Sequence, residues 1–311
     1  MITIIVSVYN EEEVLNFFWE DLERHLTIGD FDYEVIFVND GSTDDSYNVL
    51  LKLSEQNNNI KIINFSKNFG HEAAMIAGMA YSCGDIVICM DADLQHPPAL
   101  LNEMIEKYNN GCEIVTMTRK NNLSQNFMQS ICSRIFYVLL NLISPFHFEI
   151  HASDFFLVSR RAANVLVNDF PERTRFLRGF IQIIGFEKTN LEYVAPERSA
   201  GKSKYSFIKL FSNALIAVIA FSNLPLRLSV AVGVLTGAGS LILGIYSIVR
   251  KLMGHVVPGY TTIVVLITFL FALQFFLIGI IGEYLGVVLD ENKKRPIYIV
   301  KDTINIKHDD A

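Results

Sequence analysis

Asp91 and Asp93 are two carboxylates separated by one residue, and Gln95 follows two residues after Asp93. Side chains of these types at this spacing could bind a metal ion. Carboxylate and amide oxygens are ligands that Mg²⁺ and Mn²⁺ favour, and such an ion completes its shell with phosphate oxygens and water. The same residues could instead form a polar turn before the helix expected from Pro97. The spacing therefore predicts a metal site in which Asp91, Asp93 and Gln95 hold Mg²⁺ or Mn²⁺.

Polar side chains also follow two other apolar runs. Tyr9 and Glu11 come after residues 2–8, and Asp40 comes after residues 33–38. Asp40 could cap the next helix from its turn, or it could accept a hydrogen bond from a nucleotide base or ribose. If these runs are parallel strands, their carboxyl ends share one edge of a sheet, where ligands bind in such folds.

The elements that must position these residues are apolar, β-branched runs that alternate with segments of helical spacing. We expect strands over residues 2–8, 33–38, 60–65, 85–90 and 113–117, and helices over residues 11–26, 44–55 and 72–82. Apolar strands separated by helices imply a mostly parallel sheet that is covered on both faces. The expected fold class is therefore α/β.

Composition narrows the function classes. The 311 residues carry a formal net charge of −7, which argues against a general nucleic-acid binder. The 4 cysteines form no CxxC pair or zinc-like spacing, so reduced thiols are expected. The apolar run at residues 1–8 is too short for a signal peptide and is expected to be a buried strand. His96, His147 and His151 lack metal-ligand spacing, and structural or surface roles are expected for them.

Two later segments can span a bilayer. Residues 230–249 and 261–289 are each almost purely apolar and long enough to cross a hydrocarbon core of ~30 Å. A short loop rich in Gly and Pro joins them, so they form a hairpin whose ends lie on one side. Basic residues are concentrated before and after the hairpin, and only Arg250 and Lys251 lie in the loop. The positive-inside rule therefore predicts that both ends are cytoplasmic.

These segments divide the chain into four parts. We expect a cytoplasmic catalytic domain over residues 1–204, an interfacial amphipathic helix over residues 205–225, two transmembrane helices within residues 226–290 (about 228–250 and 261–288), and a cytoplasmic tail over residues 291–311. The last ten or so residues of this tail are polar and are expected to be loose. Residues 123–144 are helical and very apolar, which suits either a helix pair packed on the sheet or a surface that dips into a membrane. The expected location is the cytoplasmic (inner) membrane, with both termini in the cytoplasm.

Several segments carry a resemblance to a known family. The segments are Val-Ser-Val-Tyr-Asn-Glu-Glu at residues 6–12, Val-Asn-Asp-Gly-Ser-Thr-Asp at residues 38–44 and Asp-Ala-Asp-Leu-Gln-His-Pro at residues 91–97. They resemble family 2 glycosyltransferases of the GT-A fold, and more narrowly the bacterial polyprenyl-phosphate glycosyltransferases related to dolichyl-phosphate mannose synthase. The similarity continues through residues 153–157, 175–179, 200–205 and 282–286, so it covers nearly the whole chain.

The resemblance implies roles for the matching residues. The nucleotide sugar would be held by Tyr9, Glu11, Asp40, Asp91 and Arg119. The metal and diphosphate would lie on Asp91, Asp93 and Gln95, with Asp93 also counted as catalytic. Asp154 would be the catalytic acidic residue near the acceptor, as a base or a positioning group. The acceptor and its phosphate would be bound by Arg134, Arg175, Arg178, Arg198, Ser203, Lys204 and Tyr205.

Some of these residues also suit simpler roles, and the chain departs from the family in places. Arg119 and Arg134 could be solvated surface charges, and Lys204 could belong to a basic cluster drawn to anionic lipid. Relatives often carry Gly-Asp-Phe-Arg where this chain has Phe156 in place of the arginine, so Arg175 or Arg178 could substitute. His71 occupies a position that is often lysine, which bears on the choice of sugar.

The resemblance implies inverting transfer of a hexose, with glucose favoured, from a UDP-sugar to polyprenyl (undecaprenyl) phosphate, by an enzyme that is a homotetramer. The second pKa of a phosphate monoester is near ~6, so the acceptor needs no strong base. Alternatives are another sugar (N-acetylhexosamine, mannose or aminoarabinose type), a processive polysaccharide synthase, or a non-catalytic lipid- or nucleotide-binding membrane protein. The missing Gln-x-x-Arg-Trp motif argues against a synthase, and the three acidic residues Asp91, Asp93 and Asp154 argue against a non-catalytic protein.

Overall fold

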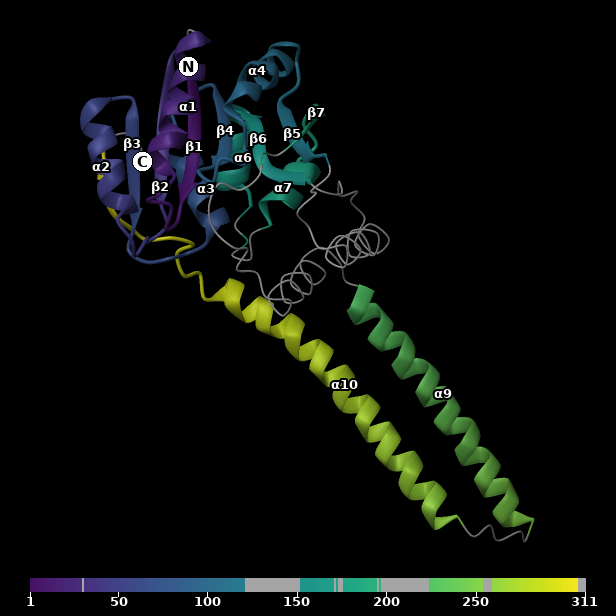
Figure 1. Ribbon diagram of the computed structural model, residues 1–311. Coiled ribbons are helices and arrows are strands. Elements are labelled where there is room, and N and C mark those ends of the chain that lie inside the picture. The colour runs from purple at the N-terminus through teal and green to yellow at the C-terminus, as the bar shows by residue number, and fades with distance from the viewer. Residues whose placement is uncertain are drawn as a thin grey trace. The chain divides into compact units, whose positions relative to one another are not determined.

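A computed structural model of the protein describes residues 1–29, 31–120, 152–170, 172, 176–194, 196, 224–253 and 259–306 (Figure 1). The chain forms two units. The first contains a β-sheet with its covering helices, and the second contains two long helices, α9 (Leu224–Leu252) and α10 (Tyr260–Asn292).

Within the described residues, eight strands form one sheet in the order β7-β5-β6-β4-β1-β2-β3-β8. The strands are β1 (Ile2–Val8), β2 (Tyr33–Asn39), β3 (Ile60–Phe65), β4 (Ile86–Asp91), β5 (Ile114–Arg119), β6 (Ala152–Ser159), β7 (Lys188–Tyr193) and β8 (Val300–Ile304). The pairs β1–β2, β1–β4, β2–β3 and β5–β7 are parallel, while β6 and β8 run antiparallel to their neighbours. The expected α/β class with a mostly parallel sheet is confirmed.

The four strands β1 to β4 are largely apolar and buried because helices cover both faces of the sheet there. The helices of this unit are α1 (Leu15–Ile28), α2 (Ser46–Gln56), α3 (His71–Tyr81), η1 (Pro98–Leu100), α4 (Leu101–Asn109), α6 (Arg160–Asn168) and α7 (Leu177–Ile183). Ile4 and Val6 of β1 share a core with Phe18 of α1. Ile5 points to the other face, where it lies so close to Gly78 of α3 that a Cβ there would come within 2.3 Å of Ile5 Cγ2.

The C-terminal strand corrects one expectation. The last ten or so residues were expected to be loose, but β8, which reaches Ile304, pairs with β3 at the edge of the sheet. Asp302 of β8 accepts hydrogen bonds from Tyr47 Oη (2.7 Å) and Asn64 Nδ2 (3.1 Å). The chain therefore returns to the sheet after α10, and its sequence could not show this because five residues are too few for a clear alternation.

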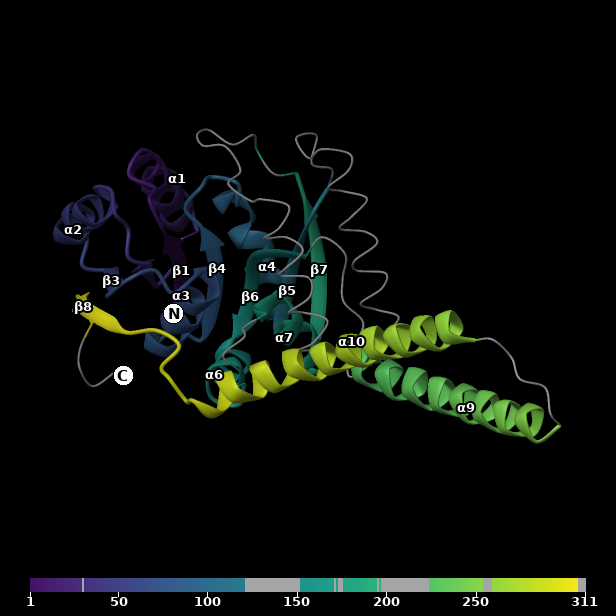
Figure 2. The ribbon, with the colours of Figure 1, turned by 90° about the horizontal axis from the view of Figure 1, so that it is seen from below.

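Helices α9 and α10 lie side by side (Figures 1 and 2). Residues Leu226–Tyr246 and Phe269–Asn292 have mean hydropathies of 2.0 and 1.9, long and apolar enough to cross a membrane. Only 6% and 0% of these stretches is buried within the structure, unlike the core helices of a soluble domain. This pair of helices is consistent with the hairpin expected from the sequence. Residues 205–223 and the apolar segment at 123–144 lie outside the described residues.

Glu34, near the start of β2, and Lys61 of β3 form a largely buried ion pair, and this pair leads to a prediction about stability. Glu34, 4% exposed, lies 2.6 Å from Lys61 Nζ and accepts hydrogen bonds from Thr3 Oγ1 and the Cys83 N–H. Burial alone would raise the pKa of Glu34, but these hydrogen bonds and Lys61 outweigh it and lower the pKa. A lowered pKa in the folded state contributes stability above the unfolded value, and this stability is lost as the pH falls through the folded value.

We therefore expect Glu34→Gln to lower the stability by about 3 kcal/mol at neutral pH, as removal of one partner of a buried pair does. The difference from the native chain should shrink as the pH falls below the ordinary glutamate value of 4.5. The apparent Tm of the purified protein, followed against pH, measures both effects. Lys188→Met on the exposed strand β7 is the control and should leave the Tm unchanged. A pH-independent loss in Glu34→Gln would contradict the assignment.

Candidate active site

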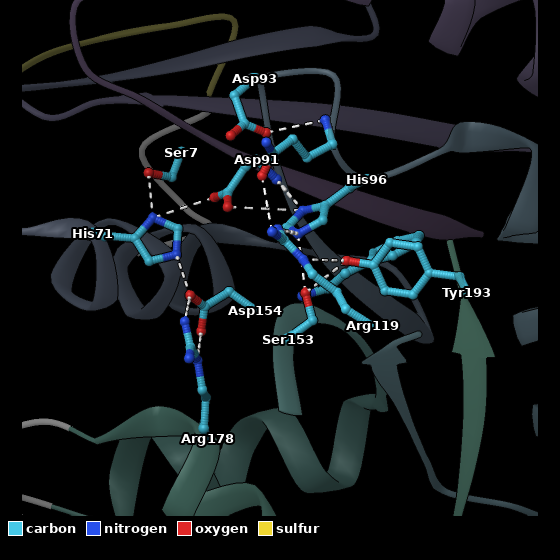
Figure 3. A network of polar contacts seen from close by, with 12 residues as sticks. Ser7, His71, Asp91, Asp93, His96, Arg119, Ser153, Asp154, Arg178 and Tyr193 are labelled. Atoms are coloured by element: carbon cyan, nitrogen blue, oxygen red, sulfur yellow. Dashed lines mark hydrogen bonds and ion pairs between the residues drawn. The ribbon is translucent and has the colours of Figure 1, made fainter. Parts of the chain in front are cut away.

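The candidate site lies where the carboxyl ends of β1, β2 and β4 meet (Figure 3). Ser7 and Asp91 are register partners across the β1–β4 pair. The structure therefore brings the ends of the three strands to one edge, as the sequence predicted. The residues described below come from this edge and from β5, β6, β7 and α7.

Asp91 ends β4, and Asp93 lies in the loop that follows it. Asp93 Oδ1 accepts a hydrogen bond from the Gln95 N–H at 3.1 Å. Burial raises the pKa of Asp91 to about 6, and the carboxylates of Asp154 and Asp93 add to the rise, while His71 opposes it. Three carboxyl groups thus share a confined space, and a divalent cation would relieve their repulsion.

His71, the first residue of α3, lies between two of these carboxylates. Its Nδ1 is 2.8 Å from Ser7 Oγ and 3.4 Å from Asp91 Oδ1, and its Nε2 is 3.5 Å from Asp154 Oδ2 (Figure 3). Burial alone would lower the pKa of His71, but Asp91 and Asp154 outweigh it and raise the pKa to about 9. A pKa raised in this way favours the protonated ring at neutral pH, and His71 lies between the carboxylates of Asp91 and Asp154.

Asp154 of β6 forms a bidentate ion pair with Arg178 of α7. Arg178 Nε donates to Asp154 Oδ1 at 2.5 Å, and Arg178 Nη2 contacts Asp154 Oδ2. Burial alone would raise the pKa of Asp154, but Arg178 and His71 outweigh it and hold the pKa well below its usual range. Because Arg178 contacts both carboxylate oxygens of Asp154, the geometry favours a positioning role over that of a general base.

A second network connects the end of β4 to β5, β6 and β7. Arg119 of β5 donates to Gln95 Oε1 and to Tyr193 Oη, both at 2.9 Å. Tyr193 Oη lies 3.0 Å from Ser153 Oγ, which is 3.0 Å from His96 Nε2. Arg119 is thus not a simple surface charge, because its guanidinium is held by the loop that carries Asp93.

Residues expected to bind the nucleotide lie at the same edge with different surroundings. Tyr9 is 44% exposed and available to a ligand, whereas Asp40 is 2% exposed. Both carboxylate oxygens of Asp40 accept backbone hydrogen bonds, from Phe69 N (2.6 Å) and Gly70 N (2.9 Å). In this structure Asp40 holds the loop before α3. The Glu11 N–H donates to Ser46 Oγ at 2.8 Å, which fixes its backbone after β1.

The predicted acceptor residues Arg134, Arg175, Arg198, Ser203, Lys204 and Tyr205 lie outside the described residues, so their roles stay predictions. Of that group, the structure places only Arg178, and it brings Arg178 to Asp154. Sequence reasoning assigned no role to Ser7 of β1, Ser153 of β6 or Tyr193 of β7, whose partners come from other elements of the fold. It noted His71 only as a departure from the family pattern, and that departure was the available signal.

Two sets of residues could hold a divalent cation, and they share Asp91. One is the predicted set of Asp91, Asp93 and Gln95, and the other consists of His71, Asp91 and Asp154, whose ligand atoms lie within 4.8 Å of one another. In the second set Asp154 already pairs with Arg178 through both of its carboxylate oxygens, which opposes metal binding. The oxygen-rich first set fits Mg²⁺ or Mn²⁺ better.

The chain is similar in sequence to known proteins over nearly its whole length. Residues 3–167 match the family model described as Glycosyl transferase family 2. Two similar relatives are a putative glycosyltransferase, CsbB, of Bacillus subtilis (strain 168), 38% identical over 100% of this chain and 94% of the relative, and an uncharacterized glycosyltransferase, sll0501, of Synechocystis sp., 35% identical over 99% and 96%. The chain therefore belongs to glycosyl transferase family 2 and is a glycosyltransferase.

A third relative has a more specific name. The bactoprenol glucosyl transferase of Shigella phage SfV is 34% identical over 302 residues, which cover 97% of this chain and 98% of the relative. The alignment thus includes both the catalytic unit and the two long helices. The resemblance to family 2 that the motifs indicated is confirmed.

The two metal sets make different predictions for His71→Gln. Glutamine keeps a polar side chain beside Asp154 but removes the charge. If Asp91 and Asp93 hold the metal, the Mn²⁺ concentration for half-maximal activity should change by less than about threefold, while turnover falls about tenfold because the two carboxylates lose their common partner. Activity titrated with Mn²⁺ separates the effects. A much larger loss of Mn²⁺ affinity would favour the His71 set, and His25→Gln on α1 is the control.

Proposed function

We propose that the protein transfers glucose from UDP-glucose to a polyprenyl phosphate carrier, with inversion at the sugar C1. The observation that carries the proposal is the similarity, over nearly the full length of both chains, to the bactoprenol glucosyl transferase of Shigella phage SfV. The acidic site at the sheet edge and the two long apolar helices support it, because the reaction needs a site for a nucleotide diphosphate and a route to a lipid.

On the donor side, Tyr9, Glu11 and Asp40 mark the end of the sheet where the uridine would lie. Tyr9 is exposed there and can stack on the base, whereas Asp40 contributes through the loop that it holds at Phe69 and Gly70. Arg119 lies beside Gln95, where its guanidinium can offset charge on the diphosphate. These side chains would orient the donor with its C1 toward Asp154.

The metal would be held by Asp91 and Asp93, with Gln95 close by, and Mg²⁺ and Mn²⁺ both suit this set of oxygen donors. The chemistry supplied by an ion held there is neutralisation of the diphosphate that departs with UDP. The partly buried carboxyl of Asp91, whose pKa is raised to about 6, fits this assignment.

On the acceptor side, a phosphate oxygen attacks the sugar C1 and the bond from C1 to the UDP oxygen breaks. The acceptor is already largely dianionic near neutral pH, so no proton needs to be removed. Among the residues predicted to bind the acceptor phosphate, Arg178 is the one that lies within the described residues. Asp154 fixes its guanidinium through two contacts. Arg134, Arg175, Arg198, Ser203, Lys204 and Tyr205 are proposed to complete this phosphate site.

We propose that α9 and α10 cross the cytoplasmic membrane, with the catalytic unit and both termini in the cytoplasm. Lysines and arginines cluster before α9 and after α10, whereas Arg250 and Lys251 alone lie near the connecting loop. The resemblance further suggests a homotetramer. Gly254 lies between α9 and α10 in the sequence. A membrane-impermeant maleimide should label Gly254→Cys in intact cells, and labelling at this position only after cell lysis would indicate the opposite orientation.

A panel of UDP-sugars tests the choice of donor. Purified full-length protein with Mn²⁺ and undecaprenyl phosphate should transfer glucose at least about tenfold faster than N-acetylglucosamine, which differs at the 2-position and should lose pocket contacts. If the protein preferred an N-acetylhexosamine, mannose or aminoarabinose donor, the assignment of glucose would be wrong, but the class of reaction would stay the same. Elongation of a polysaccharide without lipid labelling would instead support a synthase.

A further inference from the structure

His96 belongs to the loop that follows Asp91 and that also carries Asp93. Its side chain is completely buried and stacks on the ring of Phe155, with ring centroids 5.1 Å apart. A histidine in such a place could be a packing residue only. The hydrogen bonds of its two ring nitrogens point to a more specific role.

The two nitrogens of His96 have different partners. Nδ1 accepts a hydrogen bond from the backbone N–H of Asp91 at 2.8 Å (Figure 3). A nitrogen that accepts carries no proton, so the ring proton of the neutral imidazole lies on Nε2. Nε2 is 3.0 Å from Ser153 Oγ, which can accept that proton's hydrogen bond, and 3.3 Å from Arg119 Nη2, which only donates and so cannot accept it. The shorter contact, with the Asp91 N–H, favours the neutral tautomer whose proton lies on Nε2.

The Asp91 N–H has a special place in the sheet. The ladder between β4 and β6 ends at the pair of Cys89 and Phe156, two residues before Asp91. His96 accepts from the Asp91 N–H at the point where that ladder no longer continues. A buried N–H without a partner is costly, so the end of β4 depends on this side chain.

The same short segment is held at its other end. Arg119 connects Gln95 to Tyr193, and Tyr193 reaches Ser153 and so His96. Between the two ends, Leu94 has a φ of 62°, a left-handed conformation that is unfavourable for a leucine. The segment from Asp91 to Gln95 is therefore kept in an unfavourable backbone conformation by contacts at both ends.

We propose that His96 is a positioning residue of the donor site, which sets the place of Asp91 and Asp93 through the Asp91 backbone. This inference rests on the proposed function, because it assumes that these carboxylates hold the metal and the donor diphosphate. His96 itself touches neither substrate nor metal, and it acts by fixing the loop that does.

Two substitutions separate positioning from packing. In His96→Asn the side-chain oxygen can take the place of Nδ1 and still accept from the Asp91 N–H, although the contact with Ser153 is lost. In His96→Gln the amide nitrogen can take the place of Nε2 and still donate to Ser153, although the acceptor for Asp91 is lost. Both remove the ring that stacks on Phe155, so packing is weakened in both.

The test measures Mn²⁺ binding by electron paramagnetic resonance in the presence of UDP, with purified full-length protein. We expect His96→Asn to bind Mn²⁺ with an affinity within about threefold of the native chain, and His96→Gln to bind about tenfold or more weakly, since a buried donor is left without a partner. In activity assays the KM for the UDP-sugar should rise for His96→Gln, while the KM for the lipid acceptor stays unchanged. His25→Asn and His25→Gln on α1 are matched controls.

Equal Mn²⁺ affinities in both variants, or equal losses that follow their Tm values, would overturn the proposal and leave His96 as a packing residue. If neither variant folds, Ser153→Ala provides the test, because it keeps the ring but removes the hydroxyl that can accept from Nε2. A several-fold loss of Mn²⁺ affinity is expected for Ser153→Ala, and native affinity would contradict the proposal. Failure of the native chain to bind Mn²⁺ with UDP would instead overturn the donor site itself.

Discussion

Asp93→Asn is expected to lower the turnover number by about a thousandfold, with little change in folding. Removal of a group that stabilises charge in the transition state costs on this order. Asparagine preserves the shape of the side chain and can still accept from the Gln95 N–H, but it removes a negative charge from the proposed metal site. The expected loss is therefore specific to metal and diphosphate binding, and it is measured as turnover at saturating Mn²⁺ together with Mn²⁺ affinity in the presence of UDP.

A matched control is Asp169→Asn at the end of α6, an exposed carboxylate that neighbours none of the site residues. It should retain native turnover. Removal of divalent ions with a chelator should abolish activity in the native chain, and added Mn²⁺ or Mg²⁺ should restore it. If Asp93→Asn kept full activity and native Mn²⁺ affinity, the metal assignment to Asp91 and Asp93 would be wrong.

Asp154→Asn is the second substitution with a large expected effect, a fall in turnover of about a hundredfold, which is typical of a displaced catalytic group. The substitution removes the negative charge of a carboxylate whose two oxygens contact Arg178 and one of whose oxygens lies beside His71. Because the role proposed for Asp154 is to position the acceptor-side cation, the affinity for UDP with Mn²⁺ should stay within about threefold of the native value.

A double-mutant cycle with Arg178→Gln separates positioning from proton transfer. If Asp154 acts by holding Arg178, the double variant should be little worse than either single variant, because each one already breaks the same pair. Arg161→Gln, an exposed arginine on α6, is the control. Native turnover in Arg178→Gln together with a large loss in Asp154→Asn would instead support Asp154 as a base.

Parts of the fold and site that depend on local pattern could be predicted from the sequence. Apolar β-branched runs marked the strands, and the place of Asp91 directly after a run put it at the carboxyl edge. The start of the first helix was predicted too early, at residue 11 instead of Leu15, because the backbone at Glu11 and Glu12 hydrogen-bonds to Ser46 and Asp44 in the next turn.

Parts that depend on tertiary contacts could not be predicted. Nothing near His71 in sequence indicates that it meets Asp154 on β6, and nothing near Asp40 indicates that backbone amides would occupy both of its oxygens. His96 was expected to be structural or on the surface, and only the fold shows which atoms its ring nitrogens contact. β8 pairs with β3, which lies far from it along the chain, so local patterning could not reveal it.

The most direct test of the central claim follows label from UDP-glucose into lipid. Purified full-length protein is placed in vesicles with undecaprenyl phosphate and Mn²⁺, and the anomeric configuration of the extracted product is determined by NMR. The account predicts one glucose per lipid phosphate in the β configuration, inverted from the α-linked donor, and no product with Asp93→Asn. Glucose retained in the α configuration, or no lipid product although the native chain binds UDP with Mn²⁺, would contradict it.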